Sequence, residues 1–522
     1  MKSAALLCAS LALLRVLAVT SAAEAASPGQ VPVDLGPQLA PFVTQGKAPG
    51  IAAIVLRGDR IIAHGVAGVR RVESSVPIQA DDEFELGSCG KAMTATLVAM
   101  LVEERRLSWD ASLAEIFHGS DGPIDPAWSQ VTILDLLHHR SGITKGHYVR
   151  FFSSIPFAGG DLARERRRFA RKMLAHPPDV APGTQFVYAN ANYLLVAAAL
   201  ERVTGQPWED LIRRRLFQPL GMTTAGFGPP GTAGQIDQPW GHGSRRLFGL
   251  IPIFNAGDTG FDPGSVSADF PRAGAPAGLV HMSMADWAKF AVLHLRGDPR
   301  NPHCIPALLS EESFAVLHRP DPRGGRSEGL QQYSAGWGGG TRPWARGNRP
   351  GDIGVVLWHP GDNGRWNTVV WIAPEIDFAV LIACNRSGMW GLCDDVAANL
   401  VREFVARTET EIPGAGLEGY WEAAFGGQAD GLQRLRLTLD IADTDPAHPS
   451  GILDSVDEVN SRFPVTGISQ DDGVIRLEFT RIRATFEGKL NSEGSELAGR
   501  WMQNGTVKSL VFQRMPRPEA RN

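Results

Sequence analysis

The sequence is poor in lysine and in cysteine, and its charges of opposite sign nearly balance. Only 8 of its 51 basic residues are lysines, so a motif that requires a lysine seldom arises by chance. The 51 Lys and Arg stand against 56 Asp and Glu, which gives a formal net charge of -5. This balance excludes nucleic acid as the main partner, because binding to a phosphate backbone needs an excess of positive charge.

The five cysteines are too few for a disulfide framework in a chain of 522 residues. A bridge between Cys384 and Cys393 stays open as an alternative. The stability must therefore come from apolar cores, and the 43% hydrophobic and 20% charged residues suit a folded globular chain. The length exceeds what one core of ordinary size can organise, so we expect two or three folding units.

Long apolar stretches are also lacking, apart from one at the N-terminus. Met1 and Lys2 precede an apolar run from Ala4 to Val19, and a small-x-small site follows at Ala23–Ala25. This pattern predicts a secretory signal over residues 1–25 and a periplasmic or secreted protein. Arg15 interrupts the run, and the alternative is an uncleaved membrane anchor.

Strand patterns open and close the first 407 residues. Ile51–Leu56 and Ile61–Val66 read as a hairpin through a turn that contains glycine, and Thr368–Ala373 and Phe378–Cys384 form a second strand pair. The region between them is mainly helical. We therefore predict an α/β unit over residues 26–407, in which helices flank one antiparallel sheet built from both chain ends and a helical subdomain is inserted.

A different pattern follows a predicted linker at residues 408–416. In residues 417–522, apolar residues such as Leu435, Leu437 and Leu439 alternate with polar ones, and turn sequences separate short strand candidates. This alternation predicts an all-β domain, either an up-and-down barrel or a sandwich.

A basic run at Arg164–Lys172 carries five arginines and one lysine in nine residues. A solvated face of a helix explains the same residues more simply than a nucleic-acid patch does. We therefore expect these side chains to face water.

The motif with most chemical meaning is Ser88-Cys-Gly-Lys91. A helix that begins at Ser88 would place the hydroxyl over free backbone N–H groups and would project Lys91 from the same face. A serine becomes a nucleophile when a base lies within hydrogen-bond reach, and a desolvated lysine can act as that base. Chance alone gives about half a Ser-x-x-Lys match in such a chain, so the motif needs support from elsewhere.

Further segments supply that support. Together with Ser88–Lys91, they resemble the serine β-lactamase and penicillin-binding superfamily, specifically the branch of class C β-lactamases, D,D-peptidases, D-aminopeptidases and related esterases. The resemblance covers roughly residues 35–407, with the segments in the order of the family. The supporting segments are Ile133–Gly142, Tyr188-Ala189-Asn190, Gly278–Asp286 and Trp358-His359-Pro360-Gly361.

The resemblance implies roles for four side chains. Ser88 would be the acylated nucleophile, and Lys91 and Tyr188 would share its proton, with either of them as the base. Asn190 would hydrogen-bond to Lys91 and to the substrate. The usual pKa values of lysine and tyrosine must be lowered or coupled for this chemistry at neutral pH.

The third family motif departs from its common form. The family often has Lys-Thr-Gly where this chain has His359-Pro360-Gly361, and the lysine and hydroxyl of that form bind a substrate carboxylate. Pro360 brings neither a hydroxyl nor a backbone donor. The resemblance places the oxyanion hole at the backbone N–H groups of Ser88 and Asp362. His359 would contact the substrate, or would be structural within a packed turn.

The C-terminal domain is similar to the lipocalin-like modules that follow some members of this family. Gly419-Tyr-Trp421 and Gly499-Arg-Trp501 both have the Gly-x-Trp form of such barrels. A tryptophan that closes a barrel end explains this form more simply than a ligand site does.

Other chemistries lack their motifs. The sequence has no His-Glu-x-x-His, no paired Cys-x-x-Cys and no nucleotide-binding Gly-x-x-x-x-Gly-Lys-[Ser/Thr], so we expect neither a metal nor another cofactor. We predict an exported serine hydrolase that acts on a small ester or amide, as an esterase or D-amino-acid amidase. The alternatives are a class C-like β-lactamase or D,D-peptidase, which would act on peptidoglycan-like substrates, and a non-catalytic penicillin- or ligand-binding protein.

Overall fold

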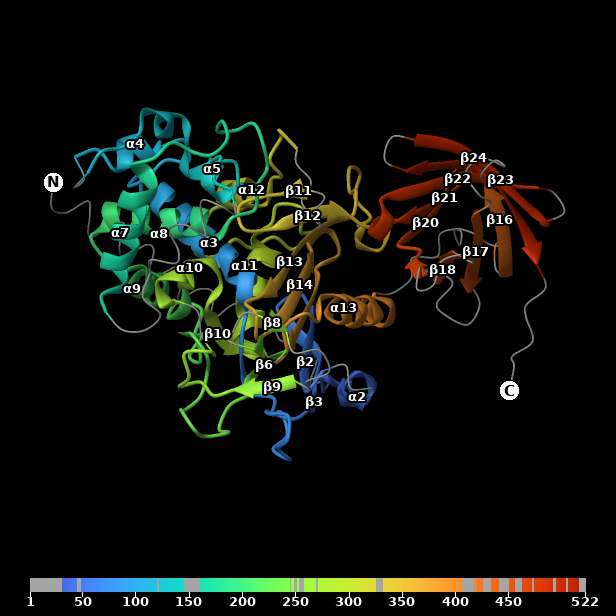
Figure 1. Ribbon diagram of the computed structural model, residues 1–522, viewed down its shortest axis with the longest axis horizontal. Helices are drawn as coiled ribbons and strands as arrows, with labels where there is room; N and C mark the ends of the chain where they lie inside the picture. The colour runs from blue at the N-terminus through green and yellow to red at the C-terminus, as the bar shows by residue number, and fades with distance from the viewer. Residues whose placement is uncertain are drawn as a thin grey trace.

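An eight-stranded sheet built from both ends of the predicted α/β unit organises the computed structural model (Figure 1). Neighbouring strands are antiparallel except for the parallel pair β1–β3. In spatial order the strands are β1 (Val33–Asp34), β3 (Arg60–Gly68), β2 (Gly50–Arg57), β15 (Phe378–Cys384), β14 (Asn367–Ala373), β13 (Val355–Asp362), β12 (Gly338–Thr341) and β11 (Gln332–Tyr333). The predicted sheet and its two strand pairs are confirmed.

The structure describes most of the predicted α/β unit and parts of the C-terminal domain. The predicted signal and linker lie outside the described residues. The described residues are 31–44, 48–119, 122–144, 160–244, 246–247, 251–252, 258–268, 271–324, 332–405, 417, 419–425, 433–440, 450–455, 462–471, 474–491, 494–503 and 506–515.

Both faces of the sheet are buried, which explains why its central strands are apolar throughout. Along β2, Ile54 packs in the core on one face, while Ile51 and Val55 pack in a second core on the other. The first core belongs to the helical region. The second is closed by α2 (Gly36–Thr44) and α13 (Trp390–Phe404). Sheets covered on both sides require such continuous apolar runs.

In the sequence the helical region lies between the two strand groups, as predicted, and in Figure 1 its helices α3, α7, α8 and α9 lie to the left of the sheet. Three short antiparallel ladders lie within it: β4 (Glu83–Glu85) and β5 (Gly226–Phe227) on either side of β10 (Val280–Ser283), β6 (Gly241–Ser244) with β9 (Asp258–Phe261), and β7 (Arg246–Leu247) with β8 (Ile251–Pro252). Its helices and helical turns are η1 (Gly87–Gly90), α3 (Lys91–Glu103), α4 (Leu113–Ile116), η2 (Pro126–Gln130), α5 (Ile133–Leu137), α7 (Leu162–Leu174), α8 (Asn190–Thr204), α9 (Trp208–Ile212), η3 (Arg213–Phe217), η4 (Arg272–Gly274), α10 (Ala275–Gly278), α11 (Met284–Gly297) and α12 (Glu311–His318).

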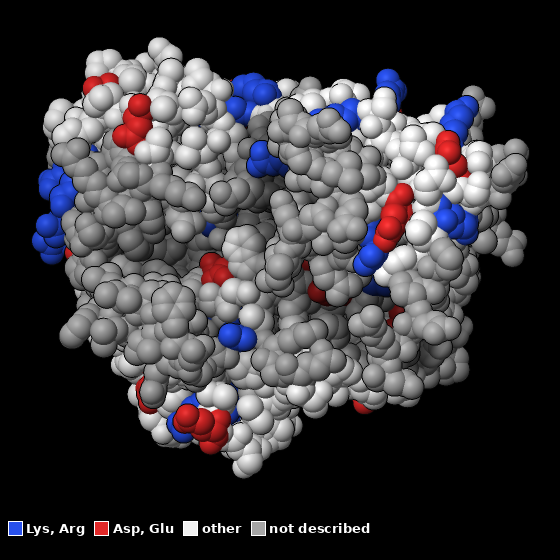
Figure 2. All heavy atoms as spheres, turned by 45° about the vertical axis from the view of Figure 1, so that its right-hand side comes forward, with Lys and Arg blue, Asp and Glu red and all other residues white. Residues whose placement is uncertain are grey.

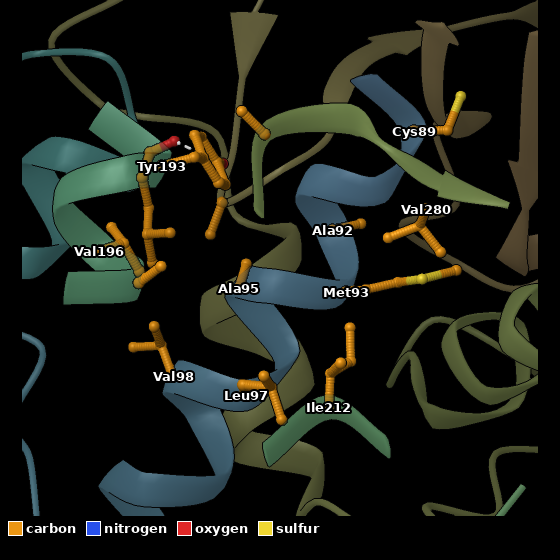
Figure 3. Packing of buried hydrophobic residues seen from close by; sticks show 14 of the residues in the cluster. Cys89, Ala92, Met93, Ala95, Leu97, Val98, Tyr193, Val196, Ile212 and Val280 are labelled. Carbon is orange, nitrogen blue, oxygen red and sulfur yellow. Dashed lines mark hydrogen bonds between the residues drawn. The ribbon is translucent and has the colours of Figure 1, made fainter. Parts of the chain in front are cut away.

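Helix α3 runs through the centre of this core. Figure 3 shows Met93 pointing toward Val280 of β10, while Val98 lies on the side of α3 nearer to Val196 of α8. Every residue of α3 from Lys91 to Leu101 is buried. The α-helix begins at Lys91 and not at Ser88 as predicted, because Ser88 lies in the 3₁₀ turn η1 that precedes it.

The basic run forms α7, but not all of it faces water. Arg166 is 0% exposed, and its guanidinium donates to Glu201 of α8 and to Glu209 of α9 at 2.5–2.9 Å. Arg167 and Arg168 are exposed, as predicted. The prediction is therefore wrong for Arg166, which joins three helices through a buried ion pair.

We expect Arg166→Met to destabilise the protein by about 3–5 kcal/mol, because the change leaves two buried carboxylates without their counter-charge. The exposed Arg168→Met on the same helix should change stability by no more than about 0.5 kcal/mol. Urea unfolding measures both variants. Equal midpoints for the two would show that the buried pair contributes nothing.

The C-terminal strands form one nine-stranded antiparallel sheet with its own core, a half-barrel that confirms the predicted all-β domain. Trp421 and Trp501 both lie in that core, and the Trp421 indole donates to the Leu417 carbonyl at 2.9 Å. Both tryptophans are therefore packing residues of this core, and their place at a barrel end stays a prediction. In spatial order the strands are β19 (Arg462–Pro464), β18 (Ser450–Ser455), β17 (Gln433–Asp440), β16 (Gly419–Phe425), β24 (Thr506–Met515), β23 (Glu496–Gln503), β22 (Ala484–Leu490), β21 (Val474–Phe479) and β20 (Gly467–Asp471).

On the face that Figure 2 presents, neither sign of charge dominates among the described residues. Figure 2 shows basic and acidic side chains interspersed over the face that it presents. In the described part of the chain, no helix combines the length and the apolar character needed to cross a bilayer.

Candidate active site

The backbone of η1 lies directly against the end of β13, and two glycines allow this contact. Gly87 has a φ of +52°, and a Cβ there would lie 2.6 Å from the Asp362 nitrogen. A Cβ at Gly361 would lie 2.1 Å from the Leu86 carbonyl oxygen. Side chains at these two positions would force the segments apart. The contact places the segment that carries Ser88 beside Gly361 and Asp362.

Lys91 lies beneath Ser88 and is fully buried. Its Nζ is 2.9 Å from Ser88 Oγ, 2.7 Å from Asn190 Oδ1 and 2.6 Å from the Ala277 carbonyl oxygen. The first turn of α8 supplies Asn190, and α10 supplies Ala277. The structure thus joins Ser88, Lys91 and Asn190 into one hydrogen-bonded group.

Burial lowers the pKa of Lys91 from its ordinary value of 10.5 to about 7. A large share of the molecules therefore carries a neutral amine near neutral pH. Asn190 Oδ1 and the Ala277 carbonyl can only accept hydrogen bonds, so they use both N–H groups of a neutral amine. The remaining lone pair of Nζ then points at Ser88.

Tyr188 also contacts the nucleophile. Its hydroxyl shares a hydrogen bond with Ser88, and burial raises the pKa of the phenol above its usual range. Lys91 Nζ is 4.9 Å from the centre of its ring. Tyr188 therefore keeps its proton at neutral pH, whereas Lys91 gives its proton up more readily.

Two aromatic side chains that the sequence analysis did not single out shape this group. His139 has a φ of +57°, and its ring lies 4.3 Å from the Tyr188 ring and 4.9 Å from the Tyr333 ring. Its Nδ1 contacts the Asn192 amide at 3.0 Å. His139 lies in the segment Ile133–Gly142, and the resemblance of this segment to the family could have indicated it. Tyr333 belongs to no motif.

His359 is 1% exposed and faces Tyr333, not open space. Its Nε2 is 3.0 Å from the Tyr333 hydroxyl, and its Nδ1 is 2.7 Å from the Pro360 carbonyl oxygen. Burial and the nearby Lys91 lower the pKa of His359 to about 3, so the ring is neutral. Both ring nitrogens are engaged within the protein, which agrees with the structural alternative. The segment is a strand, however, and not the packed turn that this alternative assumed.

Asp362 turns its carboxylate away from Ser88 and holds the loop before α13. The carboxylate accepts hydrogen bonds from Ser387 Oγ at 2.9 Å, from the Gly388 N–H at 3.1 Å and from the Trp390 indole at 2.8 Å. Only the backbone of Asp362 is thus left to serve the site, as an oxyanion donor would require.

Asn363 and Glu85 tie the two oxyanion segments together. Asn363 Nδ2 donates to the buried Glu85 carboxylate at 2.7 Å, while its Oδ1 accepts from the Arg365 and Trp366 N–H groups. Glu85 precedes Ser88 by three residues, and Asn363 follows Asp362 directly. The sequence analysis missed this pair, because residues so far apart carry no shared motif.

Cys89 beside the nucleophile is a packing residue. Its Sγ lies 3.2 Å from the His359 carbonyl oxygen, and burial raises the pKa of the thiol to about 12. In the described part of the chain, no three His, Cys, Asp or Glu side chains gather as a metal site would require.

The comparisons agree with this geometry. The beta-lactamase family model matches residues 38–400. Penicillin-binding protein 4 of Amycolatopsis lactamdurans is 27% identical over 373 residues, which are 71% of this chain and 89% of that protein. The D-aminopeptidase of Brucella anthropi is 21% identical over 481 residues, 89% of this chain and 81% of that enzyme.

Among solved structures, the octameric penicillin-binding protein homologue from Pyrococcus abyssi has a similar fold, with a TM-score of 0.55 at 18% identity. The alignment covers 91% of this chain and 98% of that one. The likeness of fold therefore extends beyond the region that the family model matches. The chain belongs to the beta-lactamase family of serine hydrolases.

Proposed function

We propose that the protein is an exported hydrolase that forms an acyl-enzyme on Ser88 and acts on a small ester or amide, as an esterase or D-amino-acid amidase. The observation that carries this proposal is the buried Lys91, whose Nζ lies 2.9 Å from Ser88 Oγ. Export rests on the N-terminal pattern of residues 1–25. A secreted protein whose intact mass lacks these residues would support it.

The geometry supports Lys91 as the base. Neutral Lys91 accepts the proton of Ser88 as Oγ bonds to the substrate carbonyl carbon, and the carbonyl oxygen takes up the negative charge. The backbone N–H groups of Ser88 and Asp362 stabilise this oxyanion. Tyr188 donates its proton to the leaving group and regains one from Lys91. Water then attacks the acyl carbon and gives a proton to neutral Lys91, the bond between that carbon and Ser88 Oγ breaks, and Oγ regains a proton from Lys91 as the acid leaves.

The chain offers poor recognition of a substrate carboxylate at β13. Both nitrogens of His359 are engaged, and Pro360 has neither a hydroxyl nor an N–H. We therefore place neutral esters and amides ahead of β-lactams as substrates. The similarity to a D-aminopeptidase supports the amide class, and the similarity to penicillin-binding protein 4 keeps the D,D-peptidase alternative in view.

Mass spectrometry of substrate mixtures tests this proposal. The purified protein is incubated separately with a short-chain aryl ester, a D-amino-acid amide and a penicillin, and the masses of protein and small molecule are followed. We expect product from the ester or the amide and an unchanged penicillin. A lasting penicillin adduct on Ser88 would favour the D,D-peptidase, and faster opening of the drug than of the ester would favour the lactamase.

The contact between Asn363 and Glu85 predicts an effect on turnover. Asn363→Asp places two carboxylates opposite each other and should separate the oxyanion donors. We expect kcat to fall by up to about 100-fold, because an error of about 1 Å in such geometry costs that much.

The double variant Glu85→Gln with Asn363→Asp restores a donor and an acceptor with their positions exchanged. We expect kcat to recover in the double variant. Equal kcat in parent and Asn363→Asp, or no recovery in a folded double variant, would show that the pair does not position the site.

A further inference from the structure

A cavity of about 400 Å³ lies at the end of α13, away from Ser88. Residues at the end of β2, in the η5 segment (Pro343–Ala345) and the loop after it, and at the β14–β15 turn form its wall. Its volume falls within the range of small-molecule sites. The wall carries three arginines, Arg57, Arg346 and Arg349, together with the indole of Trp344.

Among the residues that the structure describes, Arg57 is a half-buried cation that forms no ion pair. Its Nη2 donates to the Phe404 carbonyl at 2.7 Å, and its guanidinium lies 5.2 Å from the centre of the Phe378 ring. Asp377 is the nearby acid, but Arg296 engages that carboxylate at 3.3 Å. Burial accordingly lowers the pKa of Arg57. A bound anion would supply the missing charge.

The carboxylates of the two acidic residues in the wall already accept hydrogen bonds from backbone N–H groups. The Glu375 carboxylate accepts from the Gly354 N–H at 2.7 Å and from the Val355 N–H at 3.1 Å. Asp352 accepts from the Arg349 N–H at 2.9 Å. Among the residues that the structure describes, Arg346 forms no ion pair. Arg57 and Arg346 are therefore the two cations of the wall left to meet an anion.

Trp344 adds an aromatic wall. Its ring stacks on Trp371 with the ring centres 6.0 Å apart and the planes at 16°, so its position is held from behind. A guanidinium pairs with a carboxylate through two parallel hydrogen bonds, and an indole face packs well against another ring. We propose that this cavity is a second binding site, distinct from Ser88, for a small aromatic carboxylate that pairs with Arg57 and Arg346 and packs on Trp344.

Isothermal titration of the full-length protein with benzoate tests the proposal, with benzyl alcohol as the uncharged probe and acetate as the ringless one. We expect saturable millimolar binding of benzoate and binding at least tenfold weaker for each of the other two probes. Arg346→Met should weaken benzoate binding at least tenfold. Arg319→Met, an exposed arginine outside the cavity, should leave it unchanged.

Arg57→Lys provides a second variant that keeps the charge but loses the two-pronged geometry, and it should weaken benzoate binding several-fold. Titration of Ser88→Ala separates the two sites, because the cavity must bind benzoate as before in that variant. Unchanged binding in Arg346→Met and Arg57→Lys would overturn the proposal. So would lost binding in Ser88→Ala, or acetate that binds as well as benzoate.

Discussion

Ser88→Ala should lower kcat/KM by about a thousandfold or more and leave the protein folded. The variant keeps the backbone N–H of Ser88 but lacks the oxygen that attacks the carbonyl carbon. No second nucleophile stands in its place, because burial raises the pKa of the neighbouring Cys89 thiol to about 12. Steady-state kinetics with the best ester or amide measures the loss, and thermal unfolding confirms that the variant is folded.

Ser129→Ala is the matched control. Ser129 is exposed in η2, and its hydroxyl donates to the Pro126 carbonyl at 2.7 Å, outside the group around Lys91. This variant should turn over substrate as the parent does. Equal activity of Ser88→Ala and the parent would contradict the hydrolase proposal and favour a protein that binds a ligand without turning it over.

Lys91→Met should abolish turnover to a similar degree, because it removes the base that faces Ser88. In the parent, activity should rise as the pH passes through about 7, since the lowered pKa of Lys91 sets the fraction of neutral amine. The pH dependence of kcat/KM measures this rise. A profile that stays flat from pH 6 to 8 would assign the base to another group.

The same substitution should change how stability depends on pH. Lys91 has a pKa of about 7 when folded and an ordinary value of 10.5. Between these values the unfolded chain binds more protons, so the free energy of unfolding of the parent rises with pH. The variant lacks this rise. Its stability relative to the parent should therefore be highest at or below pH 7 and should fall by at most about 1.4 kcal/mol per pH unit toward pH 10.

Urea unfolding at several pH values measures this difference. Lys489→Met, at an exposed position of β22, is the control and should show a difference that barely changes with pH. A constant difference between Lys91→Met and the parent would mean that the buried amine is charged in both states.

Local patterns predicted the parts of the site that lie close together in sequence. Ser88 and Lys91 are three residues apart, so their spacing alone places this pair, whereas Tyr188 and Asn190, two residues apart at the start of α8, were predicted from the family resemblance. Tyr333 could not be found in this way. It reaches the site through the sheet, because β11 pairs with β12 and β12 pairs with β13. Its partner His359 lies on β13, 26 residues away in the sequence.

The burial of the charged side chain of Arg166 could not be predicted from the sequence either. Arg166 looks like its exposed neighbours in sequence, and its partners Glu201 and Glu209 follow 35 and 43 residues later on other helices. The strand conformation at Pro360 could not be predicted from the local sequence either. β12 pairs with β13 only as far as Trp358, so the missing N–H of Pro360 breaks no bond of that ladder.

The pairing of β2 with β15 determines when in synthesis this protein can become active. Val55 lies opposite Val380, so the central pair of the sheet joins segments that leave the ribosome more than three hundred residues apart. A contact of such sequence separation forms late, because its loop-closure entropy must first be offset by other contacts. The strand β13 that holds Ser88 in place belongs to the same late group. A nascent chain that ends before Phe378 therefore carries Ser88, Lys91 and β13 but lacks β15, the strand that joins β2 to β14 and completes the sheet.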